Sequence, residues 1–172
     1  MAEVRFCSSF YCVQNLNIAF YRKEYIFMRI VIQRVNKAEV EVKEQVVGKI
    51  ERGFLVLLGV THTDTKEQAD YLVKKLCNLR VFTDENGKMN LGLKEVEGEL
   101  LIVSQFTLYS DCTNGNRPSF IEAAKAEQAN ELYEYFCSEC EKNDIKVERG
   151  IFGADMQVSL VNDGPVTIII EK

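Results

Sequence analysis

One apolar segment limits what this chain can fold into more than any other feature. From Phe54 to Val60 the sequence is apolar throughout, broken only by Gly59. A strand with one face in water alternates apolar and polar residues, whereas a strand covered on both faces is apolar along its length. The segment therefore predicts a strand buried on both faces. Residues 100–106 predict a second buried strand, with polar residues at its end.

Two helices are predicted to cover these strands. Thr65 and Gln68 have the spacing of a capping box, and the residues that follow repeat at helical spacing. A second capping box, Ser119 with Glu122, predicts a long helix that continues to about Lys142. The apolar stripe of the first helix is Ala69, Leu72, Val73 and Leu76, and that of the second is Ala129, Leu132, Tyr133, Phe136, Cys137 and Cys140.

The remaining β-rich segments lie near both ends of the chain. Residues 29–35 and 38–43 come before the central strand, and residues 156–161 and 166–171 predict two final strands joined by a tight connection at 163–165. A length of 172 residues fits one domain. The pattern indicates a single α/β domain with mixed β-sheets covered by two helices. Residues 1–27 differ in composition and predict either a disordered N-terminal extension or a start codon upstream of Met28, with the domain at 28–172.

Composition excludes several classes of protein. No stretch approaches the roughly 18 apolar residues of a membrane span, and no secretory signal is recognisable. Six scattered cysteines then indicate reduced thiols in a cytoplasmic protein. A net charge of −5 argues against nonspecific coating of nucleic acid, so neither a membrane nor DNA is an expected partner.

The usual side-chain catalysts are missing. The single histidine, His62, lies in a polar turn without a nucleophile and carboxylate beside it, which favours a solvated side chain. Cys137 and Cys140 form a CxxC, but both lie on a helical apolar stripe, where cysteine acts as a small core residue. We therefore expect no metal and no cofactor. Backbone N–H groups, hydroxyls and groups on the substrate remain available for chemistry.

Two segments have unusual content. Ser104, Gln105 and Thr107 are polar residues at the end of an apolar strand, where they either bond neighbouring strands or line a pocket. Gly164 and Pro165 follow Asn162 and Asp163 between the two final strands. This second segment is either an ordinary hairpin turn or a rigid backbone wedge that presents carbonyl oxygens to a ligand.

These two segments resemble the signature motifs of the D-aminoacyl-tRNA deacylase family. The Ser-Gln-Phe-Thr sequence at 104–107 and the Asn-Asp-Gly-Pro-Val-Thr sequence at 162–167 both match, as do residues 28–35, 78–82, 87–90, 117–120 and 152–156. The resemblance extends from Met28 to about Glu171. It implies a barrel-like core of mixed sheets and an enzyme that works as a homodimer.

The resemblance also implies the reaction. Such an enzyme hydrolyses the ester that joins a D-amino acid to the 3′ end of tRNA, or glycine mischarged on tRNA-Ala. The bond between Gly164 and Pro165 is expected to be cis, and the pair is expected to enter the partner's pocket and exclude L-amino acids through main-chain atoms. A filter that tolerates many side chains has to act through backbone atoms, because side-chain contacts would narrow the range of substrates.

The roles of further residues follow from the same resemblance. Ser104, Gln105, Phe106 and Thr107 are expected to line the pocket, with the N–H near Phe106 as the oxyanion donor. Arg34 is expected to hold the partner's Gly-Pro loop, with support from Asn162. The adenosine of the tRNA end is assigned to Phe152 and Met156. Because residues 111–117 are less basic than is usual in the family, phosphate contacts fall to Arg80, Lys88 and Arg117.

Three questions stay open at the level of sequence. Thr107 is either the nucleophile or an accessory to the ribose 2′-hydroxyl of the substrate, and we favour the hydroxyl because no base lies near Thr107 in the motif. A related enzyme with a trans Gly-Pro bond would instead remove an L-amino acid, although Arg34 favours the D-selective form. A non-catalytic dimeric tRNA-binding module would keep the fold but would not need both motifs.

Overall fold

The central strand predicted from the apolar run is β3 (Gly53–Gly59), and every residue from 53 to 60 except Leu57 is buried. The computed structural model describes residues 27–172. The prediction for the N-terminal extension therefore lies outside the described residues, apart from Phe27.

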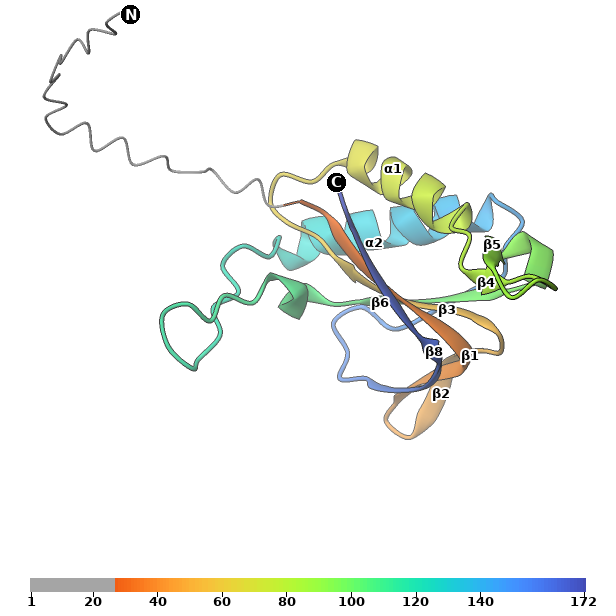
Figure 1. The fold of residues 1–172 in the computed structure, drawn as a ribbon. Helices are drawn as coiled ribbons and strands as arrows, with labels where there is room; N and C mark the ends of the chain where they lie inside the picture. Colours follow the sequence, from red (N-terminus) through yellow and green to blue (C-terminus); the bar gives the residue numbers. More distant parts are fainter. Residues whose placement is uncertain (1–26) are drawn as a thin grey trace, which may run out of the picture.

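The described chain alternates strands and helices along its length (Figure 1). The elements other than β3 are β1 (Arg29–Val42), β2 (Gln45–Ile50), α1 (Lys66–Cys77), β4 (Phe82–Thr83), β5 (Met89–Leu91), the 3-10 turn η1 (Lys94–Val96), β6 (Glu99–Ser104), the 3-10 turn η2 (Phe106–Tyr109), α2 (Ala126–Glu141), β7 (Val147–Arg149) and β8 (Gln157–Glu171).

The main sheet is mixed and nearly closed as a barrel. Its order is β2-β1-β3-β6-β7, with β8 paired to β1. β1 is antiparallel to β2, β3 and β8, whereas β6 runs parallel to both β3 and β7. The two ends of the order meet, because a Cβ atom at Gly48 of β2 would lie 2.7 Å from the carbonyl oxygen of Arg149 in β7. The fold is therefore the predicted single α/β domain with a barrel-like core.

The strands bury their two faces in two separate cores. Phe54, Val56 and Ile102 point to one core, which they share with α1 and α2. The alternate residues Leu55 and Leu101 point into the second core, inside the barrel. In Figure 1 the two helices lie over one face of the sheet. This two-sided packing explains why β3 is apolar at successive positions rather than at every second one.

One of the two predicted helix starts is confirmed and the other is wrong. Thr65 caps α1, and Gln68 completes the capping box as expected. The second helix begins at Ala126 after Lys125, seven residues later than Ser119. Ser119 instead exchanges two 2.8 Å backbone hydrogen bonds with Asp111, which hold it in an isolated antiparallel bridge. The predicted apolar stripe of this helix is confirmed from Leu132 to Cys140.

The final two strands are one strand, which corrects the predicted tight connection. β8 pairs with β1 on both sides of an interruption in the register. Gln33 is opposite Thr167, whereas Val35 is opposite Asn162. A step of two residues on β1 thus matches a step of five on β8. Residues 163–166, here called the Gly-Pro bulge, leave the ladder at this point, and the chain then continues in the same direction.

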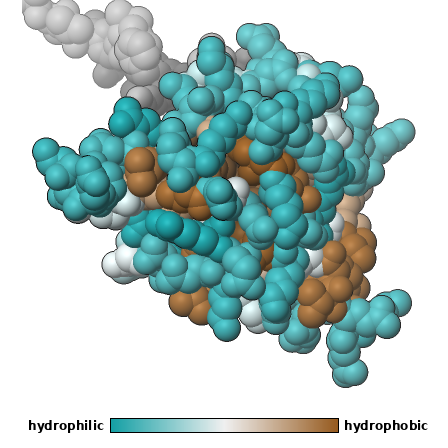
Figure 2. All heavy atoms as spheres, turned by 90° about the vertical axis from the view of Figure 1, so that its right-hand side faces the viewer, coloured by the Kyte–Doolittle hydropathy of each residue, from teal (hydrophilic) through white to brown (hydrophobic). Residues whose placement is uncertain are grey.

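The end of the molecule that carries β4 and β5 has a mostly hydrophilic surface, on which hydrophobic side chains gather in separate patches (Figure 2). Among residues 27–172, no helix is both long and apolar enough to cross a membrane.

Candidate functional site

A cavity of about 580 Å³ opens between the end of β6 and the helix α2. Its walls are mostly apolar, and polar side chains are contributed by Ser104 and Gln105 at one end. The lining also includes Leu58, Val60, Val103, Phe106, Phe120, Ala123, Ala124, Ala126, Ala129, Tyr133, Phe152, Gly153, Ala154, Met156 and Val158. A volume of this order suits a small molecule or the end of a larger ligand.

The Ser-Gln-Phe-Thr segment stands at the mouth of this cavity. β6 ends at Ser104, and the N–H of Gln105 donates to the carbonyl of Leu58 at 2.8 Å, which extends the β3–β6 ladder by one bond. The chain then turns into η2, which leaves the Phe106 ring 58 % exposed. The first N–H groups of such a turn, at Phe106 and Thr107, have no carbonyl partner within it and are free to face a ligand.

Thr107 is not among the lining residues, but it lies next to one of them. The side-chain amide of Gln105 donates a short hydrogen bond to the Thr107 hydroxyl oxygen. No histidine, carboxylate or lysine in the described chain forms a hydrogen bond with that hydroxyl. A hydroxyl that accepts a bond from an amide is not activated as a nucleophile, because activation requires a base that takes its proton.

The opposite wall is built on Tyr133, which the sequence placed only in a core stripe. Its hydroxyl donates to the carbonyl oxygens of Ile102, at 2.8 Å, and Gly150, at 3.2 Å, and its ring packs against Phe152. Burial raises the pKa of Tyr133, so the hydroxyl remains a donor at neutral pH. The phenol thereby ties α2 to β6 and to the segment that carries Phe152.

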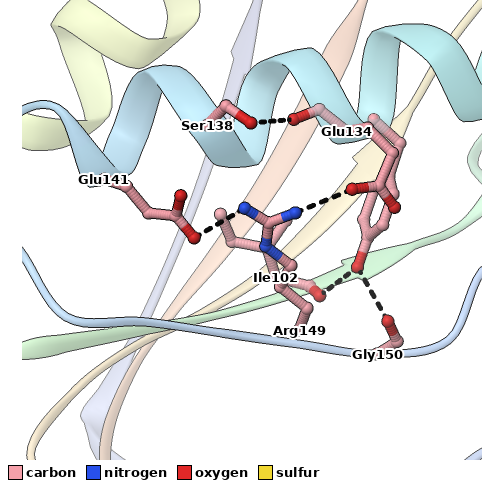
Figure 3. A network of polar contacts seen from close by, with 7 residues as sticks. Ile102, Glu134, Ser138, Glu141, Arg149 and Gly150 are labelled. Atoms are coloured by element: carbon pink, nitrogen blue, oxygen red, sulfur yellow. Dashed lines mark hydrogen bonds and ion pairs between the residues drawn. The ribbon is translucent and has the colours of Figure 1, made fainter.

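Arg149 strengthens the same wall, although it does not line the cavity itself. Figure 3 shows its guanidinium between two carboxylates of α2. Its two terminal nitrogens bond the carboxylates of Glu134 and Glu141 on α2, at 2.7 and 2.6 Å. These glutamates lie close to two helical turns apart, so one guanidinium spans that part of the helix. Arg149 directly precedes Gly150, whose N–H donates to Ile102 at 2.9 Å. The two ion pairs of Arg149 and the hydrogen bond of Gly150 therefore fix the start of the 150–156 segment that lines the cavity.

The third wall is a loop held by the turn after β3. Phe120, Ala123 and Ala124 of this loop line the cavity. The Thr61 hydroxyl donates to the carbonyl of Glu122 at 2.6 Å, and Nε2 of His62 lies 2.7 Å from the carbonyl oxygen of Ile121. The histidine is therefore exposed but not merely solvated, which corrects the expectation from sequence. Its polar neighbours gave no signal for this contact, because the two segments are far apart in the chain.

A buried acidic side chain, Asp64, holds the backbone of the same turn. Oδ2 of Asp64 accepts a 2.7 Å hydrogen bond from the N–H of Thr61, and its side chain is almost fully buried. Burial raises the pKa of Asp64 to about 6, against a smaller lowering by hydrogen bonds from the backbone of Thr61 and Met28. Gln128 of α2 donates to the carbonyls of His62 and Asp64 at 3.1 Å each, and so links the turn to the helix.

The Gly-Pro bulge lies outside the cavity lining. Gly164 and Pro165 are both exposed, the peptide bond between them is cis, and Gly164 has a φ of +119°. Asn162 closes the base of the bulge: its side-chain amide donates to Oε1 of Gln33 at 2.7 Å, and its oxygen accepts from the N–H of Val166 at 3.4 Å.

Arg34 holds the bulge from below. It is 6 % exposed, and its Nε lies 2.9 Å from the Asp163 carboxylate and 3.3 Å from the Asp163 carbonyl oxygen. A second nitrogen donates to the carbonyl of Val81. The contact with a partner's loop that the resemblance implies stays a prediction, and the contacts with Asp163 are with the bulge of the same chain. The reason is local: Arg34 lies on β1 at the step in register where β8 bulges.

The predicted phosphate contacts do not share one surface. Arg80 precedes the hairpin of β4 and β5, and Lys88 lies in the turn between these two strands. Nε of Arg80 donates to the carbonyl of Asn90 in β5. Arg117 lies in the loop after η2, which is at the opposite end of the molecule in Figure 1. All three side chains belong to exposed residues.

Neither cysteines nor acidic residues form a metal centre in the part of the chain that is described. No group of three or more His, Cys, Asp or Glu residues between 27 and 172 is placed to hold an ion. Cys137 and Cys140 are buried in the core beside Cys77, and burial raises the pKa of the Cys137 thiol to about 12.

The chain folds as a single α/β domain with a nearly closed, barrel-like sheet, and an apolar cavity lies between the end of β6 and α2. The family model described as D-Tyr-tRNA(Tyr) deacylase matches residues 31–171. The chain therefore belongs to this family.

Curated relatives and a solved structure agree with that assignment. A D-aminoacyl-tRNA deacylase of Thermosipho africanus is 60% identical over 145 residues, which cover 84% of this chain and 97% of the relative. One from Cytophaga hutchinsonii is 57% identical over 146 residues, with the same coverage. The solved structure of a protein named c-Myc DNA Unwinding Element Binding Protein superposes with a TM-score of 0.78 at 42% identity, covering 84% of this chain and 99% of its own.

Proposed function

We propose that this chain hydrolyses the ester bond of D-aminoacyl-tRNA and releases free tRNA and the D-amino acid. The observation that carries the proposal is the Ser104–Thr107 segment at the mouth of an apolar cavity that also contains Phe152 and Met156. The cavity would receive the terminal adenosine, and the scissile ester would lie near Phe106. The family membership and the named relatives support the same activity.

Main-chain and substrate groups would perform the chemistry. The N–H of Phe106 would stabilise the oxyanion, a contribution of about 3 kcal/mol for one well-placed donor. The ribose 2′-hydroxyl of the substrate would supply activation, because the Thr107 hydroxyl accepts a bond from Gln105 and bonds to no base. Thr107→Ala should then keep most of the activity.

Replacement of the terminal adenosine by 2′-deoxyadenosine decides whether Thr107 is the nucleophile or an accessory to the ribose 2′-hydroxyl. If RNA assists, single-turnover assays should show no release of D-tyrosine from the deoxy substrate while Thr107→Ala remains active. Full activity on the deoxy substrate would rule out the RNA-assisted mechanism, and loss of activity in Thr107→Ala would favour a threonine nucleophile.

Selection against L-amino acids would fall to the Gly-Pro bulge acting across a homodimer. The exposed main chain of Gly164 and Pro165 is absent from the lining of its own cavity, so it is available to a second subunit. β8 pairs with β1 on one side only among the described strands, and its exposed side chains include Val161 and Ile169. An unpaired strand edge with apolar side chains favours association with another copy.

The activity and its stereochemistry can be tested in one assay. D-Tyr-tRNA, L-Ala-tRNA and glycyl-tRNA(Ala) should be offered in parallel to the purified chain, as full-length protein and as a version that starts at Met28. We expect turnover of the first and the third and none of the second. Release of L-alanine alone would identify the L-selective relative, and binding of tRNA without any release would identify a non-catalytic module. The cytoplasmic location stays a prediction.

A further inference from the structure

The turn that would carry the chemistry is short and largely outside the two cores, so something must fix its position. η2 spans only four residues, and two backbone hydrogen bonds close it: Leu108 N–H to the carbonyl of Gln105 at 3.3 Å and Ser110 N–H to the carbonyl of Thr107 at 3.1 Å. A 3-10 turn of this length does not hold itself rigid. Contacts from the rest of the fold therefore decide where the N–H of Phe106 and the hydroxyl of Thr107 point.

Tyr109 anchors the end of the turn inside the protein. Its ring is 5 % exposed and packs against Gly59, where an added Cβ would lie 2.9 Å from a ring carbon. Its hydroxyl lies 2.7 Å from the carbonyl oxygen of Phe27 and 3.1 Å from that of Gly59, so both neighbours are acceptors and the phenol is the donor. Burial, assisted by the negative charge of Asp64, raises the pKa of Tyr109 and keeps that proton in place.

Arg29 grips the same turn from β1. Nη1 of Arg29 donates to the carbonyl of Leu108 at 2.8 Å, and the guanidinium lies 5.6 Å from the centroid of the Tyr109 ring. A cation at the last carbonyls of a helical turn is favourable, because those carbonyls have no partner within the turn. Glu171 of β8 forms a short ion pair with Nε of Arg29 and sits opposite it in the β1–β8 ladder. The arginine is thus itself fixed by two strands.

We propose that Arg29 and Tyr109 are positioning residues for the deacylation, which together set the orientation of the Phe106 N–H that would stabilise the oxyanion. The inference rests on the proposed function, since it concerns the rate of that reaction. Neither residue lines the cavity. Their loss should therefore lower kcat and leave KM for the tRNA within about twofold, because displacement of a reacting group by a fraction of an ångström costs rate rather than affinity.

The test compares two variants with two matched controls over a range of D-Tyr-tRNA concentrations, so that kcat and KM are obtained separately. Arg29→Met and Tyr109→Phe should each lower kcat about tenfold. Arg52→Met is the control for the first, because Arg52 also lies over an aromatic ring, that of Phe82, at 5.2 Å. Tyr135→Phe is the control for the second, since it loses one hydrogen bond to Asp70 far from the turn in sequence. Both controls should keep the wild-type kcat.

Three further measurements separate positioning from general damage. Arg29→Lys should recover part of the lost kcat, because its ammonium can still reach a carbonyl. Binding of a non-hydrolysable amide analogue of the aminoacyl-adenosine should be unchanged in every variant. If Arg29→Met does not fold, Tyr109→Phe gives the answer alone, since it keeps the ring and the arginine contact.

The possible failures are distinguishable. Wild-type kcat in folded Arg29→Met and Tyr109→Phe, or an effect confined to KM, would overturn this inference while leaving the proposed activity intact. Absence of turnover by the unmodified chain would overturn both.

Discussion

The cavity wall and the Gly-Pro bulge are built by opposite means. Side chains of α2 and the 150–156 segment make the wall, and hydrogen bonds from Tyr133 and Arg149 fix it within one chain. The bulge is made of exposed main chain, held from below by Arg34 and Asn162. Packed side chains give a cavity one fixed shape, which suits one chemical group. Exposed main-chain atoms can contact ligands that differ in their side chains. Under the proposed function, the contrast predicts that affinity and stereochemical selection respond to different mutations.

Gly164→Ala should have the largest effect, and it should fall on selection. A Cβ at this position would lie 2.9 Å from Nη2 of Arg34, and a φ of +119° is strained for any residue with a side chain. We expect discrimination between D- and L-Tyr-tRNA to fall by about a hundredfold as the bulge shifts. Parallel deacylation assays measure this ratio. Gly87→Ala is the control, because Gly87 also has a positive φ but no atom within 4 Å of its Cβ position.

Ala129→Phe should have the next largest effect, and it should fall on affinity. Ala129 lies on α2 and lines the cavity, so a phenyl group there would occupy space meant for the ligand. We expect a rise in KM of about tenfold, which corresponds to a loss of about 1.4 kcal/mol of binding free energy. The D to L ratio should stay at the wild-type value in the same assays. A fall in that ratio would show that wall and bulge are not separate.

The two variants together test whether the bulge acts in the partner's site. In a mixed dimer, one subunit carries Ala129→Phe and the other carries Gly164→Ala. If the bulge reaches across the dimer, the site of the Gly164→Ala subunit has a normal cavity and receives the normal bulge of its partner. Equal mixing should then restore selective turnover to about a quarter of the wild-type level, as expected for random pairing in a two-fold symmetric dimer. Mixing without any recovery would place the bulge in its own subunit's site.

Asp64→Asn should change how the free energy of unfolding of the chain depends on pH. Asp64 lies in the turn that holds the third wall of the cavity. The pKa of Asp64 is raised to about 6 in the folded chain, above its usual 3.8, so the folded state holds the proton more tightly. The protonated carboxyl therefore favours folding at low pH, and this contribution is lost as pH rises from about 4 through 6. Because asparagine can still accept from Thr61, the variant should be more stable than wild type at pH 8 and about equal near pH 4. Urea unfolding at both values measures this.

Arg149→Met should have the smallest effect. The side chain of Arg149 is 28% exposed and those of its glutamate partners about half exposed, and ion pairs of this kind contribute at most about 1 kcal/mol. We expect a rise in KM of about twofold without a change in the D to L ratio, and less of it at high salt. A large effect on selection instead would mean that the wall also reads stereochemistry.

The secondary structure could be read from the sequence wherever a signal was local and strong. The double-sided burial of β3, the capping box at Thr65 and the buried stripe around Phe136 all follow from short-range spacing. Ser119 had the same capping-box spacing, but a bridge to Asp111 took its backbone hydrogen bonds and delayed the helix to Ala126. A local pattern states what a segment can do, and a competing long-range contact decides whether it does so.

The candidate site shows the same division. The sequence by itself identified the motif residues Ser104 to Thr107, together with Phe152 and Met156, because their chemistry is unusual where it occurs or matches a family pattern. Only the tertiary structure brought these residues, with the exception of Thr107, to the lining of one cavity. It also added Tyr133 and the loop held by His62, and it placed the Gly-Pro bulge outside that cavity in one continuous strand. The physical reason is register. The pairing of β8 with β1, more than a hundred residues away in the chain, determines where the bulge leaves the ladder, and no local pattern contains that pairing.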